Sequence, residues 1–117
     1  MSLITLWHNP KCSKSRATAE LLEDKKVKTR VVRYLDETLT KEELETVLKM
    51  LSMKPRELIR TKEDIYRELE LADEDSDEKL IYAMIENPKL IERPIVIKGE
   101  KAVIGRPIEN VIELLDS

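Results

Sequence analysis

The sequence predicts an α/β fold in which helices pack on a mixed sheet of about four strands. A strand-helix-strand unit lies near the start of the chain, and such a unit favours parallel pairing of its two strands. A tight hairpin followed by a helix lies near the end, and a tight hairpin pairs its strands antiparallel. The stretch between these two parts has helical patterns, which would enlarge the middle of the fold.

The first unit is predicted from local composition. Residues 3–7, "LITLW", have the β-branched and aromatic content of a buried strand, and Asn9-Pro10 ends it. A helix is expected from residue 12 or 13 to about residue 25, and residues 29–34, "TRVVRY", give the second strand. The apolar stripe of this helix is predicted to consist of Ala17, Leu21 and Leu22.

The middle of the chain has the spacing of several helices. Thr40 with Glu43 three residues later is a capping box, and it opens the first of them. Further helices are expected from apolar residues at helical spacing over residues 55–59, 61–69 and 80–87. Thr61 with Asp64 suggests the start of the second of these, with Ile65 and Leu69 facing inward.

The last part of the chain predicts a hairpin and a helix. In "PIVIKGEKAVIG", two short apolar runs flank Gly99-Glu100, a Gly-X turn that suits the twist of paired strands. Pro107 is expected to begin the final helix. This element order is the thioredoxin-like topology with an enlarged helical segment, and residues 1–117 are expected to form a single domain. Arg93-Pro94 falls just before the third strand, where thioredoxin-like folds place a cis proline beside the active thiol.

Composition restricts the function classes. The net charge of −3 argues against general nucleic-acid binding, and no apolar run reaches membrane-spanning length. The first residues lack the pattern of a signal peptide. One cysteine cannot form an internal disulfide, which fits a reducing compartment, so a cytoplasmic location is expected.

The stretch "HNPKCSKSR" holds the only cysteine and the only histidine of the chain. Cys12 falls where a strand ends and a helix begins, and free backbone N–H groups there favour negative charge. The pKa of this thiol is therefore expected to be lowered, with Lys11, Lys14 and Arg16 adding to the effect. A nucleophilic sulfur in an anion-binding loop suggests attack on an anionic electrophile. The other interpretation of a lone cysteine, a small buried apolar residue, is disfavoured by its polar neighbours.

Three neighbours of the thiol have two interpretations each. His8 could tune the thiol through its charge or a hydrogen bond, or it could end the strand and cap local backbone, which we favour. Ser13 and Ser15 are candidate donors to a bound anion, and helix capping explains them almost as well.

Arginines form the second half of the candidate site. Arg93 and Arg106 each precede a proline at an end of the predicted hairpin, in "ERPIVI" and "IGRPIE". In a thioredoxin-like sheet Arg93 should face Cys12, and Arg106 could do the same. Arg60, in "ELIRTKED", has no position that the pattern alone predicts. The guanidinium fork suits planar, multi-oxygen anions because it donates two parallel hydrogen bonds.

Four stretches, "HNPKCSKSR", "ELIRTKEDIYRELEL", "NPKLIERPIVI" and "AVIGRP", resemble the glutaredoxin-coupled arsenate reductase family, ArsC, in its short bacterial form. The resemblance runs over residues 4–115 and implies that the chain reduces arsenate to arsenite. Arsenate would bind at the anion loop, the Cys12 thiolate would attack arsenic, and glutathione and glutaredoxin would supply the electrons. The anion-binding arginines of the family match Arg60, Arg93 and Arg106.

The resemblance implies no metal and no tightly bound cofactor, with glutathione as co-substrate, and a monomer is expected. The cysteine count independently requires an external thiol, because Cys12 cannot resolve its own adduct by an internal disulfide. Two other functions are open. One is an Spx-like regulator that binds RNA polymerase, although its usual C-x-x-C switch is here "CSKS". The other is a monothiol glutaredoxin-like protein, whose C-x-x-S pattern is present without accounting for the arginines.

Overall fold

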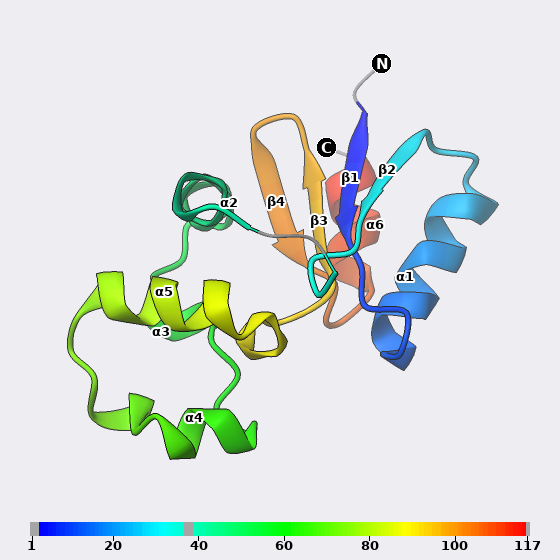
Figure 1. The fold of residues 1–117 in the computed structure, drawn as a ribbon. Helices are drawn as coiled ribbons and strands as arrows, with labels where there is room; N and C mark the ends of the chain where they lie inside the picture. Colours follow the sequence, from blue (N-terminus) through cyan, green and yellow to red (C-terminus); the bar gives the residue numbers. More distant parts are fainter. Residues whose placement is uncertain (1–2, 37–38, 117) are drawn as a thin grey trace. The chain divides into compact units, whose positions relative to one another are not determined.

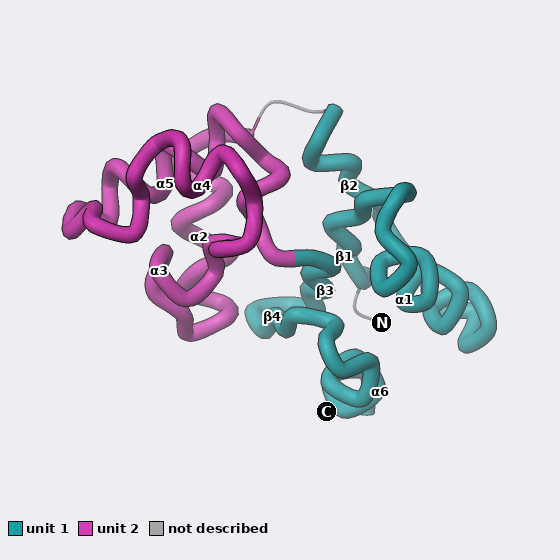
Figure 2. Tube along the Cα trace, turned by 90° about the horizontal axis from the view of Figure 1, so that it is seen from below, with its two compact units in different colours: residues 1–37, 93–117 teal, residues 38–92 magenta. Residues whose placement is uncertain are grey.

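The computed structural model describes residues 3–36 and 39–116. The chain divides into two compact units, which Figure 2 shows in different colours. Unit 1 consists of residues 1–37 and 93–117, and unit 2 of residues 38–92. The two ends of the chain therefore belong to the same unit, and unit 2 is inserted between them.

Unit 1 contains the predicted mixed sheet (Figure 1). Among the described residues the strand order is β2-β1-β3-β4. β1 and β2 pair in parallel, whereas β3 pairs antiparallel with both β1 and β4. The strands span Ile4–Trp7 (β1), Thr29–Val32 (β2), Ile95–Lys98 (β3) and Lys101–Ile104 (β4). The second strand is thus shorter than predicted, and Tyr34 beyond it stacks on the Trp7 ring with 6.2 Å between centroids.

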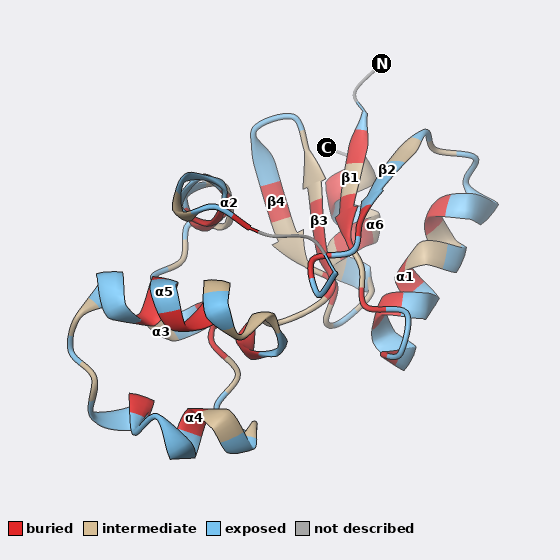
Figure 3. Ribbon diagram, in the orientation of Figure 1, coloured by how far each residue is buried: buried red, intermediate tan, exposed pale blue. Residues whose placement is uncertain are grey.

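Helices α1 (Ser13–Asp24) and α6 (Glu109–Asp116) pack against one face of this sheet. Figure 3 shows the buried segments of the strands and helices in red. The core of the face consists of Ile4, Leu6, Leu22, Val96, Val111 and Leu114. The helix α1 has nearly the predicted bounds, and α6 begins two residues after Pro107, because residues 107–110 form a turn closed by Asn110 N–H and Pro107 O.

The predicted apolar stripe of α1 was partly wrong. Ala17 is exposed, and the buried residues of the helix are Ser15, Thr18 and Leu22. Two hydroxyl side chains can be buried here because each finds a hydrogen-bond partner: Ser15 in the loop before the helix and Thr18 at Lys14 O. The stripe therefore starts with polar residues at the end of the helix that carries the cysteine.

The predicted hairpin is present. Gly99 has a φ of +60°, a backbone conformation that a glycine adopts at no steric cost, and it stands at the tip between β3 and β4. The Arg93-Pro94 and Arg106-Pro107 peptide bonds, one before and one after the hairpin, are both cis.

Unit 2 is helical. Its elements are α2 (Lys41–Leu51), α3 (Pro55–Leu58), α4 (Asp64–Glu68), η1 (Leu71–Asp73), α5 (Asp77–Glu86) and η2 (Pro88–Leu90). The capping box of Thr40 and Glu43 at the start of α2 is confirmed, with both reciprocal hydrogen bonds present. An antiparallel bridge joins Ile59 to Ile91. It brings the residue after α3 beside the residue after η2 and closes the unit.

The prediction for the helix near residue 64 was wrong in its inward face. Tyr66 is buried, Ile65 is partly buried and Leu69 is 46% exposed. The N-cap is Glu63 rather than Thr61, so the helix is short and its buried face is shifted. The Tyr66 hydroxyl accepts a hydrogen bond from Arg56 Nη1 at 2.9 Å, and this polar partner lets an aromatic residue take the inward position.

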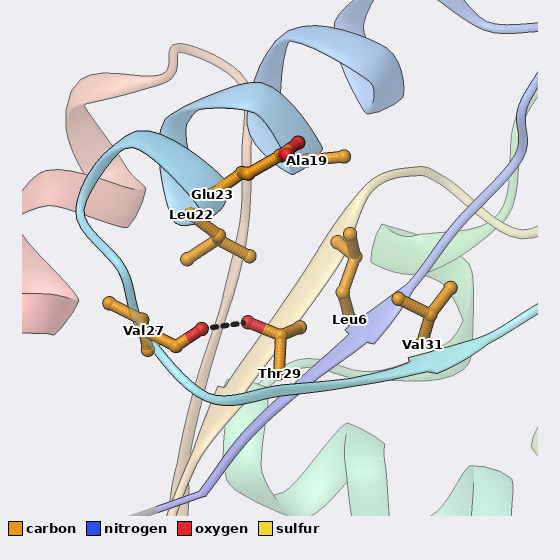
Figure 4. Close-up of a pocket in the computed structure, with 7 residues that line it drawn as sticks. All are labelled: Leu6, Ala19, Leu22, Glu23, Val27, Thr29 and Val31. Carbon is orange, nitrogen blue, oxygen red and sulfur yellow. Dashed lines mark hydrogen bonds between the residues drawn. The ribbon is translucent and has the colours of Figure 1, made fainter.

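A pocket in unit 1 lies between the second half of α1 and the β1–β2 part of the sheet (Figure 4). It is lined by Leu6, Ala19, Leu22, Glu23, Val27, Thr29 and Val31. None of the site residues predicted from the sequence is among them. Separately, no helix among residues 3–36 and 39–116 combines the length and the apolar character needed to cross a membrane.

Candidate active site

Cys12 occupies the turn that leads from β1 into α1. The turn is closed by its own backbone, because Cys12 N–H donates to Asn9 O at 3.0 Å. The Asn9 side chain supports it, since Asn9 Oδ1 accepts from Lys11 N–H at 3.0 Å. Cys12 is the N-cap residue of α1, with extended backbone angles (φ −96°, ψ 123°). The thiol therefore lies where the first N–H groups of a helix lack intrahelical acceptors.

Ser15 holds this loop together from inside. Its side chain is fully buried, and its Oγ accepts a hydrogen bond from Asn9 N–H at 3.0 Å. The same oxygen lies 2.7 Å from His8 Nδ1. Burial, followed by the charge of Arg33, lowers the pKa of His8 below 6.5, so the ring is neutral at neutral pH. In the tautomer with an unprotonated Nδ1, a neutral His8 accepts a hydrogen bond from the Ser15 hydroxyl, and in the other tautomer it donates one.

The pKa of the Cys12 thiol lies below its ordinary value of 9.0. Burial by itself raises this pKa, since only 8% of Cys12 is exposed. Hydrogen bonds from the backbone N–H groups of Ser15 and Lys14 lower it, and the charge and hydrogen bond of Arg106 lower it further. The lowering agrees with the prediction, but the cationic side chains of "KCSKSR" are not among its causes.

Arg106, far from Cys12 in the sequence, contacts the thiol. The carboxyl ends of β1 and β4, the start of β3 and the start of α1 all lie at the lower edge of the sheet in Figure 1. From the end of β4, Arg106 Nη2 donates to Cys12 Sγ at 3.3 Å. Its Nε donates to Arg93 O at 2.8 Å, which fixes the direction of the guanidinium. A cation held in this way stabilises a thiolate and any anion bound beside it.

Arg93 contributes buried donors. Its Nε and Nη1 are buried, and within residues 3–36 and 39–116 neither atom has a hydrogen-bond partner. A charged donor that is buried without an acceptor is costly, so native structures usually supply one. An oxyanion is an acceptor of the right charge and shape for two guanidinium N–H groups. The contacts among Arg93, Arg106 and Cys12 thus place free donors beside a thiol of lowered pKa.

Arg60 lies in unit 2, after α3. Its Nη1 pairs with Glu63 Oε1 at 2.7 Å and its Nε with Glu92 Oε1 at 3.1 Å. The bridge beside it fixes the backbone, because Arg60 N–H donates to Leu90 O at 2.7 Å. Two carboxylates therefore orient the guanidinium of Arg60 within its own unit.

Comparison with known proteins agrees with this geometry. A family model described as "ArsC family" matches residues 7–114. The chain belongs to the ArsC family. It is 45% identical over 117 residues to a protein named arsenate reductase from Haemophilus influenzae (strain ATCC 51907 / DSM 11121 / KW20 / Rd), with 98% of this chain and 100% of that protein covered.

Two more relatives match this ArsC-family chain over nearly its whole length. It is 51% identical over 114 residues to "Uncharacterized protein YfgD" of Escherichia coli (strain K12), with 96% of each covered. It is similar to a solved structure named arsenate reductase from Vibrio cholerae, with a TM-score of 0.92, 45% identity, and 96% of this chain and 97% of that chain covered. The predicted fold class, a thioredoxin-like mixed sheet with an enlarged helical segment, is confirmed.

The predicted site residues of the ArsC-family chain fall into two groups. Within unit 1 the structure joins Cys12, Arg106 and the backbone of Arg93, and it joins His8 to Ser15. The favoured structural role of His8 fits its contact with Ser15. The Ser15 hydroxyl is buried and accepts a hydrogen bond from Asn9 N–H inside the loop. The backbone N–H of Ser15, rather than its side chain, therefore bonds to the thiol. Ser13 is exposed in the first turn of α1. The anion-binding roles of Ser13, Ser15, Arg60, Arg93 and Arg106 stay predictions, as does the catalytic role of Cys12.

The role of Asn9 in the site was not predicted from the sequence. Asn9 was assigned only as part of a strand breaker, yet it is buried and gives its carbonyl to Cys12 and its side-chain oxygen to Lys11. The local signal was present, because an Asn before a proline often accepts hydrogen bonds from the following backbone. Among residues 3–36 and 39–116, no group of His, Cys, Asp and Glu side chains is placed to hold a metal ion. That no metal or cofactor is needed remains a prediction.

Proposed function

We propose that the protein is an arsenate reductase that uses Cys12 as its nucleophile and takes electrons from glutathione and glutaredoxin. The observation that carries the proposal is the contact of Arg106 with a thiol of lowered pKa at a helix N-terminus. The unpartnered donors of Arg93 support an oxyanion as the substrate. The relatives named arsenate reductase indicate which oxyanion this is.

In the proposed reaction, the Cys12 thiolate attacks the arsenic atom of arsenate. An S–As bond forms while one As–O bond breaks, and the departing hydroxide takes a proton from solvent and leaves as water. Arg93 and Arg106 neutralise the remaining oxyanion charge. Two external thiols are then oxidised to a disulfide. Their two electrons convert As(V) to As(III), and the S–As bond breaks to release arsenite and regenerate the Cys12 thiolate.

The external thiols are required by the chain itself. Cys12 is the only cysteine of the sequence, so no second cysteine of the same chain can form a disulfide with it. Glutathione and glutaredoxin are the thiols that the family resemblance implies, and they are part of this proposal. A cytoplasmic, monomeric protein fits such partners.

The proposal is tested by an arsenate reduction assay with purified protein, glutathione, glutaredoxin and an NADPH-coupled system that recycles glutathione. NADPH consumption that depends on arsenate is expected, with arsenite as the product detected by chromatography. Absence of turnover above background, with the glutaredoxin shown to be active on a standard disulfide, would refute the proposal.

The matched control is Cys12→Ser, which replaces one sulfur atom by oxygen at the helix N-terminus. We expect it to keep the fold, measured by circular dichroism, and to lose turnover. Retained turnover would show that Cys12 is not the nucleophile. Substitution of glutathione and glutaredoxin by thioredoxin and its reductase should leave arsenate reduction at background, and equal rates with both systems would refute the assigned electron donors.

A further inference from the structure

Two segments of the candidate site meet at Gly105, the buried residue between β4 and Arg106. Its N–H donates to Pro94 O at 2.8 Å, which ties the end of β4 to the segment just before β3. Its φ lies outside the left-handed region, in contrast to Gly99 with a φ of +60°. Backbone conformation therefore does not explain why a glycine stands here.

Space does explain it. A Cβ atom on Gly105 would lie 2.8 Å from Pro94 Cγ, 3.0 Å from Thr18 Oγ1 and 3.2 Å from Val111 Cγ2. All three distances are shorter than the ordinary van der Waals range of 3.4–4 Å. The loop before β3, helix α1 and helix α6 thus all pack directly against the backbone of Gly105.

The contact with α1 concerns the turn that bears the thiol. Thr18 is fully buried, and its Oγ1 donates to Lys14 O at 3.1 Å, so it is fastened to the first turn of α1. That turn supplies the N–H groups of Lys14 and Ser15 to Cys12 Sγ. On the other side of the contact, Arg106 follows Gly105 directly in the chain. Gly105 thus lies between the turn that carries the thiol and the arginine that contacts it.

We propose that Gly105 is a positioning residue of this site, which by lacking a side chain lets α1 and the end of β4 approach until Arg106 reaches Cys12 Sγ. The inference rests on the proposed role of Cys12 as a nucleophile. Its physical content, the alignment of Arg106 with the sulfur, is measurable in the absence of arsenate.

The test is Gly105→Ala, read out as the thiol pKa obtained from the pH dependence of the rate of alkylation by iodoacetamide. The added methyl group pushes Pro94 and Thr18 apart, so the Arg106 hydrogen bond to sulfur lengthens. We expect the thiol pKa to rise by about one unit, which is the size expected when a hydrogen bond to a charged group is lost. An unchanged thiol pKa in a folded Gly105→Ala variant would overturn the inference.

Two controls separate positioning from a general loss of structure. Gly99→Ala adds a methyl group with nothing within 4 Å at the far end of the same hairpin, so it should leave the thiol pKa unchanged although its positive φ costs stability. In an Arg106→Ala background, Gly105→Ala should cause little further rise of the thiol pKa. Additive shifts of the thiol pKa in the double variant would show that Gly105 does not act through Arg106.

A second variant keeps the inference testable if Gly105→Ala does not fold. Thr18→Ala/Gly105→Ala removes Thr18 Oγ1 but keeps Pro94 Cγ, the atom nearest to the added methyl group at 2.8 Å. The start of Arg106 is therefore still displaced, and the thiol pKa should rise relative to Thr18→Ala; an equal thiol pKa would again overturn the inference. These outcomes are distinct from those of the arsenate assay. A raised thiol pKa together with an inactive wild-type protein would refute the proposed function and leave the positioning role of Gly105 in place.

Discussion

At the scale of single residues, the groups in contact with Cys12 Sγ determine the pKa of the thiol. The lysines and arginine beside it in the sequence are exposed, whereas the groups that favour the thiolate are two backbone N–H groups and one distant guanidinium. Exposed cations are screened by water and salt, but a donor in direct contact keeps its strength. Geometry therefore outweighs the count of nearby positive charges.

Arg106→Lys tests this at the guanidinium itself. Lysine keeps the positive charge but cannot donate to Cys12 Sγ and to Arg93 O at the same time with a fixed fork. We expect the thiol pKa to rise, by less than in Arg106→Ala, and kcat/KM for arsenate to fall at least about tenfold. Alkylation rates against pH and steady-state kinetics measure the two effects. Wild-type values in Arg106→Lys would mean that charge suffices.

His8 should make the stability of the fold depend on pH. Because burial and Arg33 hold its folded-state pKa below 6.5, the unfolded chain binds more protons in the window between the two values. The free energy of unfolding contributed by His8 is therefore present above pH 6.5 and is lost as pH falls through the lowered pKa. The measurement is the free energy of unfolding in urea as a function of pH, for Cys12→Ser and for Cys12→Ser/His8→Asn. The Cys12→Ser background removes the titrating thiol from both proteins. A pH-independent difference between these two proteins would contradict the assignment.

At the scale of elements, helix starts are set by local hydrogen bonds. The capping box of α2 is the best-defined example, because Thr40 Oγ1 accepts from Glu43 N–H at 3.1 Å while Glu43 Oε1 accepts from Thr40 N–H at 3.3 Å. The described start of α1 has no oxygen side chain as a cap, and the N–H groups of Lys14 and Ser15 act on Cys12 Sγ instead. The uncapped N–H groups of α1 are the ones available to the sulfur and to an anion.

Thr40→Ala is expected to lower the free energy of unfolding by about 1 kcal/mol, the usual loss for an N-cap hydroxyl. The matched control is Thr46→Ala in the middle of the same helix. Thr46 is exposed and its hydroxyl bonds to Glu42 O within the helix, so its loss should be close to neutral. Chemical denaturation measures both variants; equal losses would show that the cap has no special weight.

At the scale of the whole molecule, unit 1 is built from both ends of the chain and unit 2 is inserted between them. The central strands β1 and β3 come from different ends, so the sheet cannot form from one continuous segment. Unit 2 has fewer than about 60 residues, a size at which an isolated core is marginal. That residues 1–117 form a single domain stays a prediction, and it implies one cooperative unfolding transition for both units.

Leu44→Ala tests that cooperativity. Leu44 is fully buried in unit 2, and its truncation should lower the free energy of unfolding by roughly 2–5 kcal/mol. Trp7, the only tryptophan of the chain, reports on unit 1 by fluorescence. We expect the Trp7 transition in urea to shift together with the circular dichroism transition. Glu45→Ala, an exposed neighbour, should move neither. A Trp7 transition left in place by Leu44→Ala would show two independently unfolding units.

The sequence by itself determined what depends on neighbours along the chain. Strand β1, the capping box of α2 and the hairpin turn at Gly99 follow from residue type and short-range hydrogen bonds, and all were predicted. The position of Cys12 at the start of α1 was predicted for the same reason. The inward face of α4 was not, because it depends on the distant partner Arg56 of Tyr66.

The tertiary structure decided the rest. Cys12 and Arg106 are separated by 94 positions, and no local pattern predicts which arginine contacts the sulfur. Nor does a local pattern predict that the Ser15 hydroxyl forms its hydrogen bond inside the loop. These contacts exist because the strand order β2-β1-β3-β4 brings the end of β4 to the start of α1, and because Gly105 leaves room for the approach. A sequence encodes such packing only through all of its long-range contacts at once. The thiol was therefore predictable from its neighbours in the sequence, whereas Arg106 was only one of two candidate arginines for the contact with it.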